Sequence, residues 1–187
     1  MRIALVFALA VAGCVPAITH VEQMPADAPA LRSPAPVVVV PVRFDAVADA
    51  SLGGDSAAWQ QAVPKWQGDY DRELVERVRS ELPGRPVRLL GAGETVPSEG
   101  VVLQSTIRDV HSSGDVAAYG RIRVTGELTF IDGASSRVLL SARVEASSNR
   151  TAPGVRTLGK QIQSACLNLA DAAAEALRLG HVPGGAK

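Results

Sequence analysis

The residues of this chain whose types could do chemistry are few and widely spaced. The histidines stand at His20, His111 and His181, and the two cysteines are Cys14 and Cys166. A zinc site needs such ligands clustered at short, regular spacing, which none of these residues has. We therefore expect no metal site.

Pairs of carboxylates are the other candidates for chemistry, and they lie in one charged helical pattern. Asp69 with Asp71, and Glu73 with Glu76, fall on a helix expected from Asp69 to Leu82. Acids on such a face are typical of a solvated surface, whereas a catalytic acid needs surroundings that shift its pKa. The sequence holds no serine-hydrolase, zinc-protease or phosphate-loop motif. We expect no catalytic residues, no cofactor and a protein that is not an enzyme.

The N-terminus has the three parts of a secretory signal peptide. Arg2 is followed by an apolar run over residues 3–11, and small residues precede Cys14. The run is shorter than the roughly 20 residues that span a bilayer. The ending Val11-Ala12-Gly13-Cys14 resembles the lipobox of bacterial lipoproteins, in which the cysteine is acylated and becomes the mature N-terminus.

This resemblance implies that residues 1–13 are cleaved as a signal peptide and that Cys14 carries the lipid. Val15 stands where an Asp would favour retention in the inner membrane. We expect a lipid anchor in the outer membrane, with the protein facing the periplasm. Cys166 is then the remaining thiol, and its place in an apolar helical pattern indicates a small buried side chain.

Composition excludes nucleic acid as a partner. The net charge is +0, hydrophobic residues make up 47% of the chain, and aromatic residues only 4%. No Lys/Arg-rich run or aromatic set on a basic strand is present. Between residues 117 and 160, however, seven basic residues stand against three acidic ones. This excess indicates either a solvated sheet face or a surface for an acidic partner or anionic lipid headgroups, with Arg121, Arg123 and Arg143 as candidates.

The pattern divides the chain after the signal peptide of residues 1–13 into three parts. Residues 14–36 are rich in proline and without apolar periodicity, which predicts a lipidated N-terminus and a semi-rigid tether. Residues 37–180 form one domain, and residues 181–187 form a flexible tail.

Within the domain, we expect strands near residues 37–42, 86–90, 101–110, 121–130 and 138–146, and helices at 69–82 and 156–179. Ile122, Val124, Leu128 and Phe130 alternate with polar residues, and Asp132-Gly133 predicts a hairpin. One apolar and one polar face is typical of an antiparallel sheet that is open on one side. The order predicts an α+β fold: a mostly antiparallel, four- to five-stranded sheet with two helices packed on one face.

Residues 45–66 show no clear period and include Pro64, so we expect a long loop with a short helix near residues 56–63. Trp59 and Trp66 lie in this loop. They either fold back over the core or anchor a protein partner, because Trp is frequent at interfaces.

The expected meander resembles small bacterial envelope lipoproteins. The segments that carry the likeness are Val101–Val110, Arg121–Val124, Leu128–Gly133 and Val138-Leu139. Two relatives are similar: uncharacterised lipoproteins of the LpoB and curli-secretion type, and the LPS-assembly lipoprotein that plugs an outer-membrane barrel.

The resemblance implies an accessory or docking factor of a cell-envelope complex for secretion, transport or cell-wall assembly. Its partners would be the membrane, through Cys14, and an envelope protein. One alternative is a lipid- or LPS-handling protein with an apolar groove between helices and sheet. A second is an unrecognised periplasmic enzyme.

Overall fold

The computed structural model describes residues 18–23, 27–46, 56–113, 121–148 and 158–182, which contain seven strands and three helices. In chain order these are β1 (Ile18–Gln23), α1 (Ala28–Leu31), β2 (Val37–Val39), β3 (Arg43–Phe44), α2 (Ser56–Glu81), β4 (Val87–Leu89), β5 (Val101–Ser113), β6 (Arg121–Asp132), β7 (Val138–Ser147) and α3 (Leu158–Leu179). Among the helices of these segments, none is long and apolar enough to cross a membrane.

The strands form one mixed sheet in the order β1-β7-β6-β5-β2-β4, and β3 pairs with the middle of β5. The β5, β6 and β7 strands pair antiparallel, as expected, and β1 continues this pattern at the β7 edge. The short strands β2, β3 and β4 are parallel to their neighbours. The α+β class is therefore confirmed, while the sheet has more strands and more parallel pairing than the sequence predicted.

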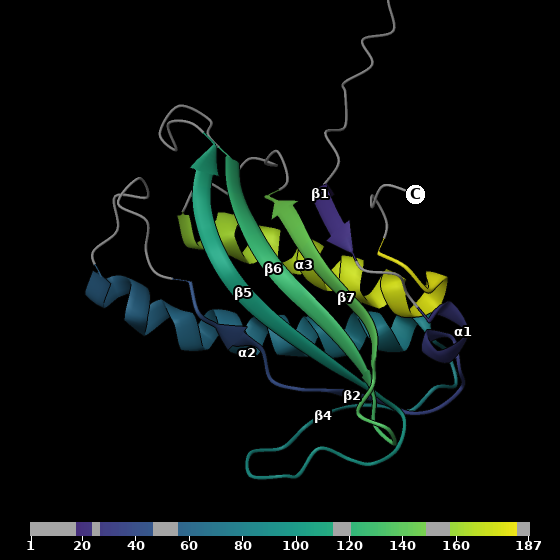
Figure 1. The fold of residues 1–187 in the computed structure, drawn as a ribbon. Helices are drawn as coiled ribbons and strands as arrows, with labels where there is room; N and C mark the ends of the chain where they lie inside the picture. Colours follow the sequence, from purple (N-terminus) through teal and green to yellow (C-terminus); the bar gives the residue numbers. More distant parts are fainter. Residues whose placement is uncertain (1–17, 24–26, 47–55, 114–120, 149–157, 183–187) are drawn as a thin grey trace, which may run out of the picture.

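Helices α2 and α3 cover one face of the sheet, and β5, β6 and β7 cross in front of them in Figure 1. The two helices run in the same direction, because contacts between them advance together along both. The Gln163 side chain donates to Asp69, Arg77 pairs with Asp171, and Arg178 pairs with Glu81. A parallel helix pair fits this topology, since the whole antiparallel meander lies between them in the chain.

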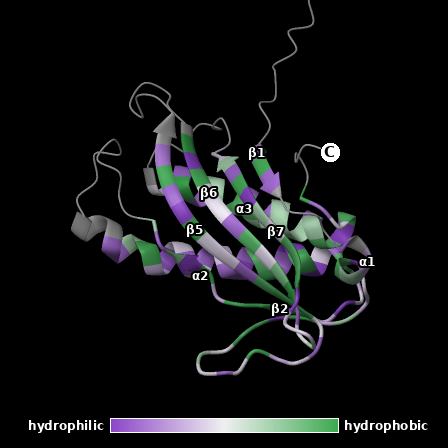
Figure 2. Cartoon of the chain, in the orientation of Figure 1, coloured by the Kyte–Doolittle hydropathy of each residue, from purple (hydrophilic) through white to green (hydrophobic). Residues whose placement is uncertain are grey.

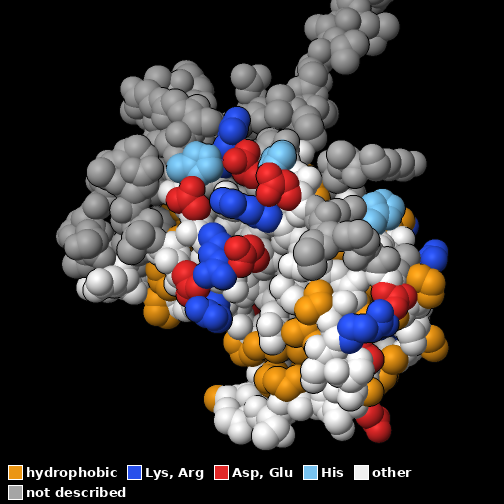
Figure 3. All heavy atoms as spheres, viewed as in Figure 1, with side chains coloured by type: hydrophobic (Ala, Val, Ile, Leu, Met, Phe, Trp, Pro, Cys, Tyr) orange, Lys and Arg blue, Asp and Glu red, His pale blue; other side chains and the backbone are white. Residues whose placement is uncertain are grey.

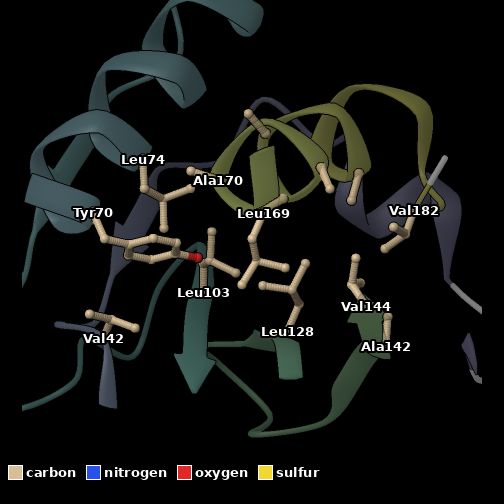
Figure 4. Close-up of a cluster of buried hydrophobic side chains, with 14 of the residues drawn as sticks. Val42, Tyr70, Leu74, Leu103, Leu128, Ala142, Val144, Leu169, Ala170 and Val182 are labelled. Carbon is tan, nitrogen blue, oxygen red and sulfur yellow. The ribbon is translucent and has the colours of Figure 1, made fainter. Parts of the chain in front are cut away.

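Alternation of apolar and polar residues places the core between sheet and helices. The inward side chains of β6 expected from the sequence, Ile122, Val124, Leu128 and Phe130, are all 0% exposed. Hydrophobic residues recur along the helices in Figure 2, and Figure 4 shows Leu169 of α3 packed beside Leu103 and Leu128 of the sheet. The largest fully buried residues are Tyr70, Phe130, Leu31, Leu74, Leu103, Ile107, Ile122, Leu128, Leu140, Ile162, Leu169 and Leu177.

Gly126 makes room for helix α3 at the centre of the sheet. It pairs with Ile107 on one side and Val144 on the other. A Cβ placed on Gly126 would stand 2.2 Å from Cδ2 of Leu169, closer than carbon atoms can approach without a clash. Because Gly126 has no side chain, it leaves a space that the Leu169 side chain fills, and we call this space the socket.

The tether expected over residues 14–36 is wrong from Ile18 onward. Strand β1 pairs with β7, Val21 lies opposite Val144, and Leu31 in α1 is 0% exposed. The Arg85 guanidinium fixes this segment further by donating to the carbonyl oxygens of Leu31 and Ala35. The sequence did not reveal β1 and α1, because neither shows a clear apolar period. The many prolines in this segment also indicated a tether.

The short helix expected near residues 56–63 does begin at Ser56, but it is the start of α2, which continues for 26 residues to Glu81. The expected loop is therefore wrong for residues 64–66, and the helix expected at 69–82 is the later part of the same helix. Pro64 lies inside this helix. A proline normally ends or kinks a helix by removing one N–H donor, which is why the sequence indicated a loop. Packing outweighs that penalty, since Val63 and Trp66 contact the core on either side of Pro64. Residues 47–55 lie outside the described part.

The turn between β6 and β7 joins the strands as Asp132-Gly133 predicts, but it is longer than a two-residue hairpin. The Asp132 carboxylate accepts hydrogen bonds from the Ala134 N–H and the Ser135 hydroxyl. These bonds, together with the Asp132 carbonyl accepting from Ser136 N–H, hold Ser136 at φ 56°.

Candidate functional site

The outer face of the sheet, meaning the surface of β5, β6 and β7 turned away from α2 and α3, carries a concentrated group of charges. In Figure 3, Arg, acidic and His side chains alternate over the upper part of this face, and hydrophobic side chains lie below them. Strand alternation causes this arrangement, because every second residue of each strand must point away from the core.

One set of ion pairs joins β3, β5 and β6. The Arg108 guanidinium donates to Glu127 Oε2 through Nε at 2.8 Å and Nη2 at 2.7 Å, and to Asp45 Oδ2 through Nη1 at 2.8 Å. Arg43 donates to the same Asp45 oxygen at 2.9 Å. The hydrogen bond to Glu127 and the two nearby carboxylates raise the pKa of Arg108. This guanidinium is therefore held as a fixed cation between two acids.

A second set joins β5, β6 and β7. The Arg123 Nη1 atom donates to Glu145 Oε1 at 3.2 Å, and His111 Nδ1 lies 3.1 Å from Asp109 Oδ2. The other ring nitrogen of His111 is 3.9 Å from Glu145 Oε2. On β1, His20 lies 3.1 Å from Glu22, and this contact lowers the pKa of the Glu22 carboxyl.

These pairs alter the meaning of the basic excess between residues 117 and 160. Arg123 in that stretch pairs with Glu145, and acids from outside the stretch, Asp45 and Asp109, lie on the same face. The outer face is thus a mixed array of both signs and not a basic patch. Thr125 shows how closely the array covers the strands: it belongs to the outer face, yet it is only 7% exposed.

The residues named from the sequence as partner contacts lie apart. Arg143 is exposed on β7 and Arg123 is on β6, so both belong to the outer face. Arg121 is the first residue of β6, but its side chain lies outside the described part, as does Cys14.

The two tryptophans belong to α2 and not to a loop. Trp66 is half-buried, with its ring centroid 6.1 Å from that of Phe44, and it lies against Gly159 at the start of α3. It therefore packs on the core, which is the first of the two roles considered for it. Trp59 lies in the early part of the helix, and its side chain is outside the described residues.

Asp71 is the polar residue that the sequence placed wrongly. It was expected on the solvated face of its helix, but it is 8% exposed and accepts the Val42 N–H at 2.8 Å. Gln67, one turn earlier, donates to the Val42 carbonyl at 3.2 Å. Burial raises the pKa of Asp71 to about 6, and the Val42 hydrogen bond opposes that rise only partly. The helical spacing could have indicated this burial, because Asp71 lies on the same side of the helix as the apolar residues Leu74, Val75 and Val78.

Cys166 and Tyr70, two residues with titratable side chains, are both buried in structural settings. Burial raises the pKa of the Cys166 thiol to about 12, so it stays protonated and unreactive. The Tyr70 hydroxyl bonds Ser105 at 3.0 Å inside the core. Within the described segments, no group of three His, Cys, Asp or Glu residues could hold a metal ion.

The fold places the chain among α+β proteins with a mixed sheet and two main helices packed against it. No family model matches the sequence, and no curated protein sequence matches it.

Solved structures from bacteria are similar to this chain to different degrees. A PelC dodecamer from Paraburkholderia phytofirmans is 14% identical, with a TM-score of 0.50 over 87% of this chain and 97% of that chain. Protein XCC0632 from Xanthomonas campestris, described by family model DUF330, is 9% identical, with a TM-score of 0.51 over 78% of this chain and 86% of that chain. Lipoprotein GNA1162 from Neisseria meningitidis is 16% identical, at a TM-score of 0.35 over 64% and 88% of the respective chains. At such identities, the similarity to PelC and XCC0632 concerns the fold alone.

Proposed function

We propose that this protein is a lipid-anchored, non-enzymatic accessory protein of a cell-envelope complex, which faces the periplasm and docks through the outer face of its sheet. The observation that carries the proposal is the array of ion pairs on β5, β6 and β7, on the face opposite α2 and α3. Each charge in this array is held in a defined position by a neighbour. Fixed charges of both signs suit recognition of one complementary partner, because they supply specificity more than affinity.

The lipid anchor in this proposal rests on Cys14 and the small residues before it. A different part of the proposal, the contact with partners, is supported by the fold shared with PelC, since PelC was solved as a dodecamer. We therefore include copies of this chain among the partners that the outer face could contact.

The lipid-handling alternative needs an apolar groove between helices and sheet. In the described residues that space is filled by side chains such as Leu103, Leu128 and Leu169, each 0% exposed (Figure 4). The packing therefore favours the docking function over the storage of an acyl chain at this position.

The proposal is tested by crosslinking in intact cells, followed by affinity purification of the tagged protein. Arg143→Glu reverses an exposed charge on the outer face, and Arg72→Glu does the same on α2, on the other side of the sheet. We expect the outer-face variant to lose most of one dominant crosslinked protein and the α2 variant to retain it. Equal recovery with both variants, or crosslinked lipid without a consistent protein, contradicts docking through this face.

The anchor is tested separately by Cys14→Ser. We expect this variant to leave the membrane fraction for the soluble periplasmic fraction while the wild-type protein remains membrane-bound. Continued membrane association of the variant would show that something other than the lipid holds the protein.

A further inference from the structure

The N-terminal anchor and the sheet are separated by very little chain. Strand β1 begins at Ile18, so only Val15, Pro16 and Ala17 stand between it and Cys14. A fully extended chain covers at most about 3.5 Å per residue, so the Cα atoms of Cys14 and Ile18 can be no more than about 14 Å apart. An acylated Cys14 must therefore hold the start of β1 close to the lipid.

The register of β1 determines which end of the sheet is brought close. Ile18 lies opposite Ala146 near the end of β7, and Ala146 lies opposite Val124 near the start of β6. The end of β5 is at this same level, since Val110 pairs with Val124. In Figure 1 these strand ends meet at the top of the view, where β1 begins. We call them the anchor end of the sheet.

The opposite end carries the turn between β6 and β7 and the connection between β4 and β5, at the bottom of Figure 1. Val138 begins β7, and eight residue steps separate it from Ala146. At about 3.3 Å per residue, this end lies roughly 26 Å from the start of β1. That distance exceeds the reach of the three-residue connection.

Charge argues against the sheet lying flat on the bilayer. Contact along the whole outer face would take the ion pairs of Arg108 with Glu127 and Asp45 out of water, and desolvation of paired charges is unfavourable. The acids on this face also offset its arginines, so anionic headgroups would gain little from contacting it.

We infer that the domain stands end-on to the membrane, with the anchor end of the sheet against the phospholipid surface and the β6–β7 turn pointing into the periplasm. This inference rests on the proposed acylation of Cys14 and adds an orientation to it. The exposed large hydrophobic residues Leu89, Val96 and Val138, at 40%, 51% and 46% exposure, then lie toward the periplasmic end.

The orientation is tested with the full-length, acylated protein in vesicles of phosphatidylethanolamine and phosphatidylglycerol that contain a nitroxide-headgroup lipid. A thiol-reactive fluorophore is placed by Asp109→Cys near the anchor end or by Ala134→Cys in the β6–β7 turn. Both sites are exposed, and the buried Cys166 does not compete for the label. We expect several-fold stronger quenching at position 109 than at position 134.

A second variant keeps the lipid but removes the constraint. A flexible insertion of about 30 Gly and Ser residues between Ala17 and Ile18 gives an average reach of roughly 30 Å. We expect it to remove the difference between the two labels. Persistence of the strong quenching at position 109 would show that the short connection does not set the orientation.

The outcomes separate the orientation from the anchor. Vesicle-bound protein with equal quenching at positions 109 and 134, or with the order reversed, overturns the end-on orientation and leaves the lipid anchor intact. Full-length protein that carries no lipid and fails to sediment with vesicles overturns both the anchor and the orientation.

Discussion

The carboxyl group of Asp71 lies beneath the chain at Val42, in a place that disfavours its charge. Burial raises its pKa from the usual 3.8 to about 6 in the folded protein, so the folded state binds the proton more tightly than the unfolded chain. Its contribution to stability is therefore most favourable below pH 4 and is lost as the pH rises through 6. At pH 7 the buried carboxylate destabilises the fold.

We predict that Asp71→Asn raises the free energy of unfolding at pH 7 and leaves it nearly unchanged at pH 4. The amide oxygen still accepts the Val42 N–H, while the unfavourable buried charge is gone. Urea unfolding across pH 4–8 measures the effect, with Glu76→Gln on the exposed face of α2 as the control. A difference between Asp71→Asn and wild type that does not change with pH would contradict this account.

Gly126 permits a second prediction at the scale of one residue. Gly126→Ala should lower the free energy of unfolding by about 1–3 kcal/mol, because its Cβ would overlap Leu169. Leu169→Ala alone should lower it by about 2–5 kcal/mol through the cavity it leaves. If the socket is the cause, the double variant is less destabilised than the sum of the two changes. Additive effects in denaturant unfolding would exclude contact between these side chains as the reason.

At the scale of elements, β1 and α1 are the segments whose importance can be tested by truncation. Chains that begin at residue 18, 27 or 37 retain both elements, α1 alone, or neither. We predict a stepwise fall in the unfolding temperature along this series, because Val21 and Leu31 are buried and each such side chain contributes about 1.5–3 kcal/mol. Calorimetry of the three proteins checks this. Equal unfolding temperatures for the three proteins would show that residues 18–36 do not stabilise the domain, as a tether would not.

How far the sequence predicted each element follows from its length and period. The strands β5, β6 and β7 and the helix α3 were predictable because ten or more residues repeat one alternation or one stripe. Strands β2 and β4 have three residues each, yet the apolar residues in and beside them indicated strands. Strands β1 and β3 contain no such apolar run, and their pairing depends on strands that are distant in the sequence. The ion pairs of Arg108 were also hidden, since Asp45 and Glu127 meet it only once the sheet has formed.

At the scale of the whole molecule, the apolar core and the proposed docking surface lie on opposite faces of the sheet. Exposed ion pairs contribute little to stability, whereas buried apolar side chains contribute much. We predict that Arg143→Glu leaves the thermal unfolding midpoint nearly unchanged, while Leu128→Ala, at a 0% exposed position, costs about 2–5 kcal/mol. Circular dichroism melts provide the comparison. A large fall for Arg143→Glu would mean that partner loss in that variant reflects unfolding.

The pairing of β1 with β7 also has a consequence for the order in which the chain can fold. Ile18 meets Ala146 only after nearly the whole polypeptide is available, so the edge of the sheet closes late. Contacts between residues so distant in sequence form slowly, because closing the intervening loop costs entropy before any contact is gained. In the proposed secretion of this chain, in which the N-terminus emerges first from a membrane channel, β1 cannot pair with β7 until Ala146 has also emerged. The topology thus delays completion of this edge of the sheet until most of the polypeptide has crossed the membrane.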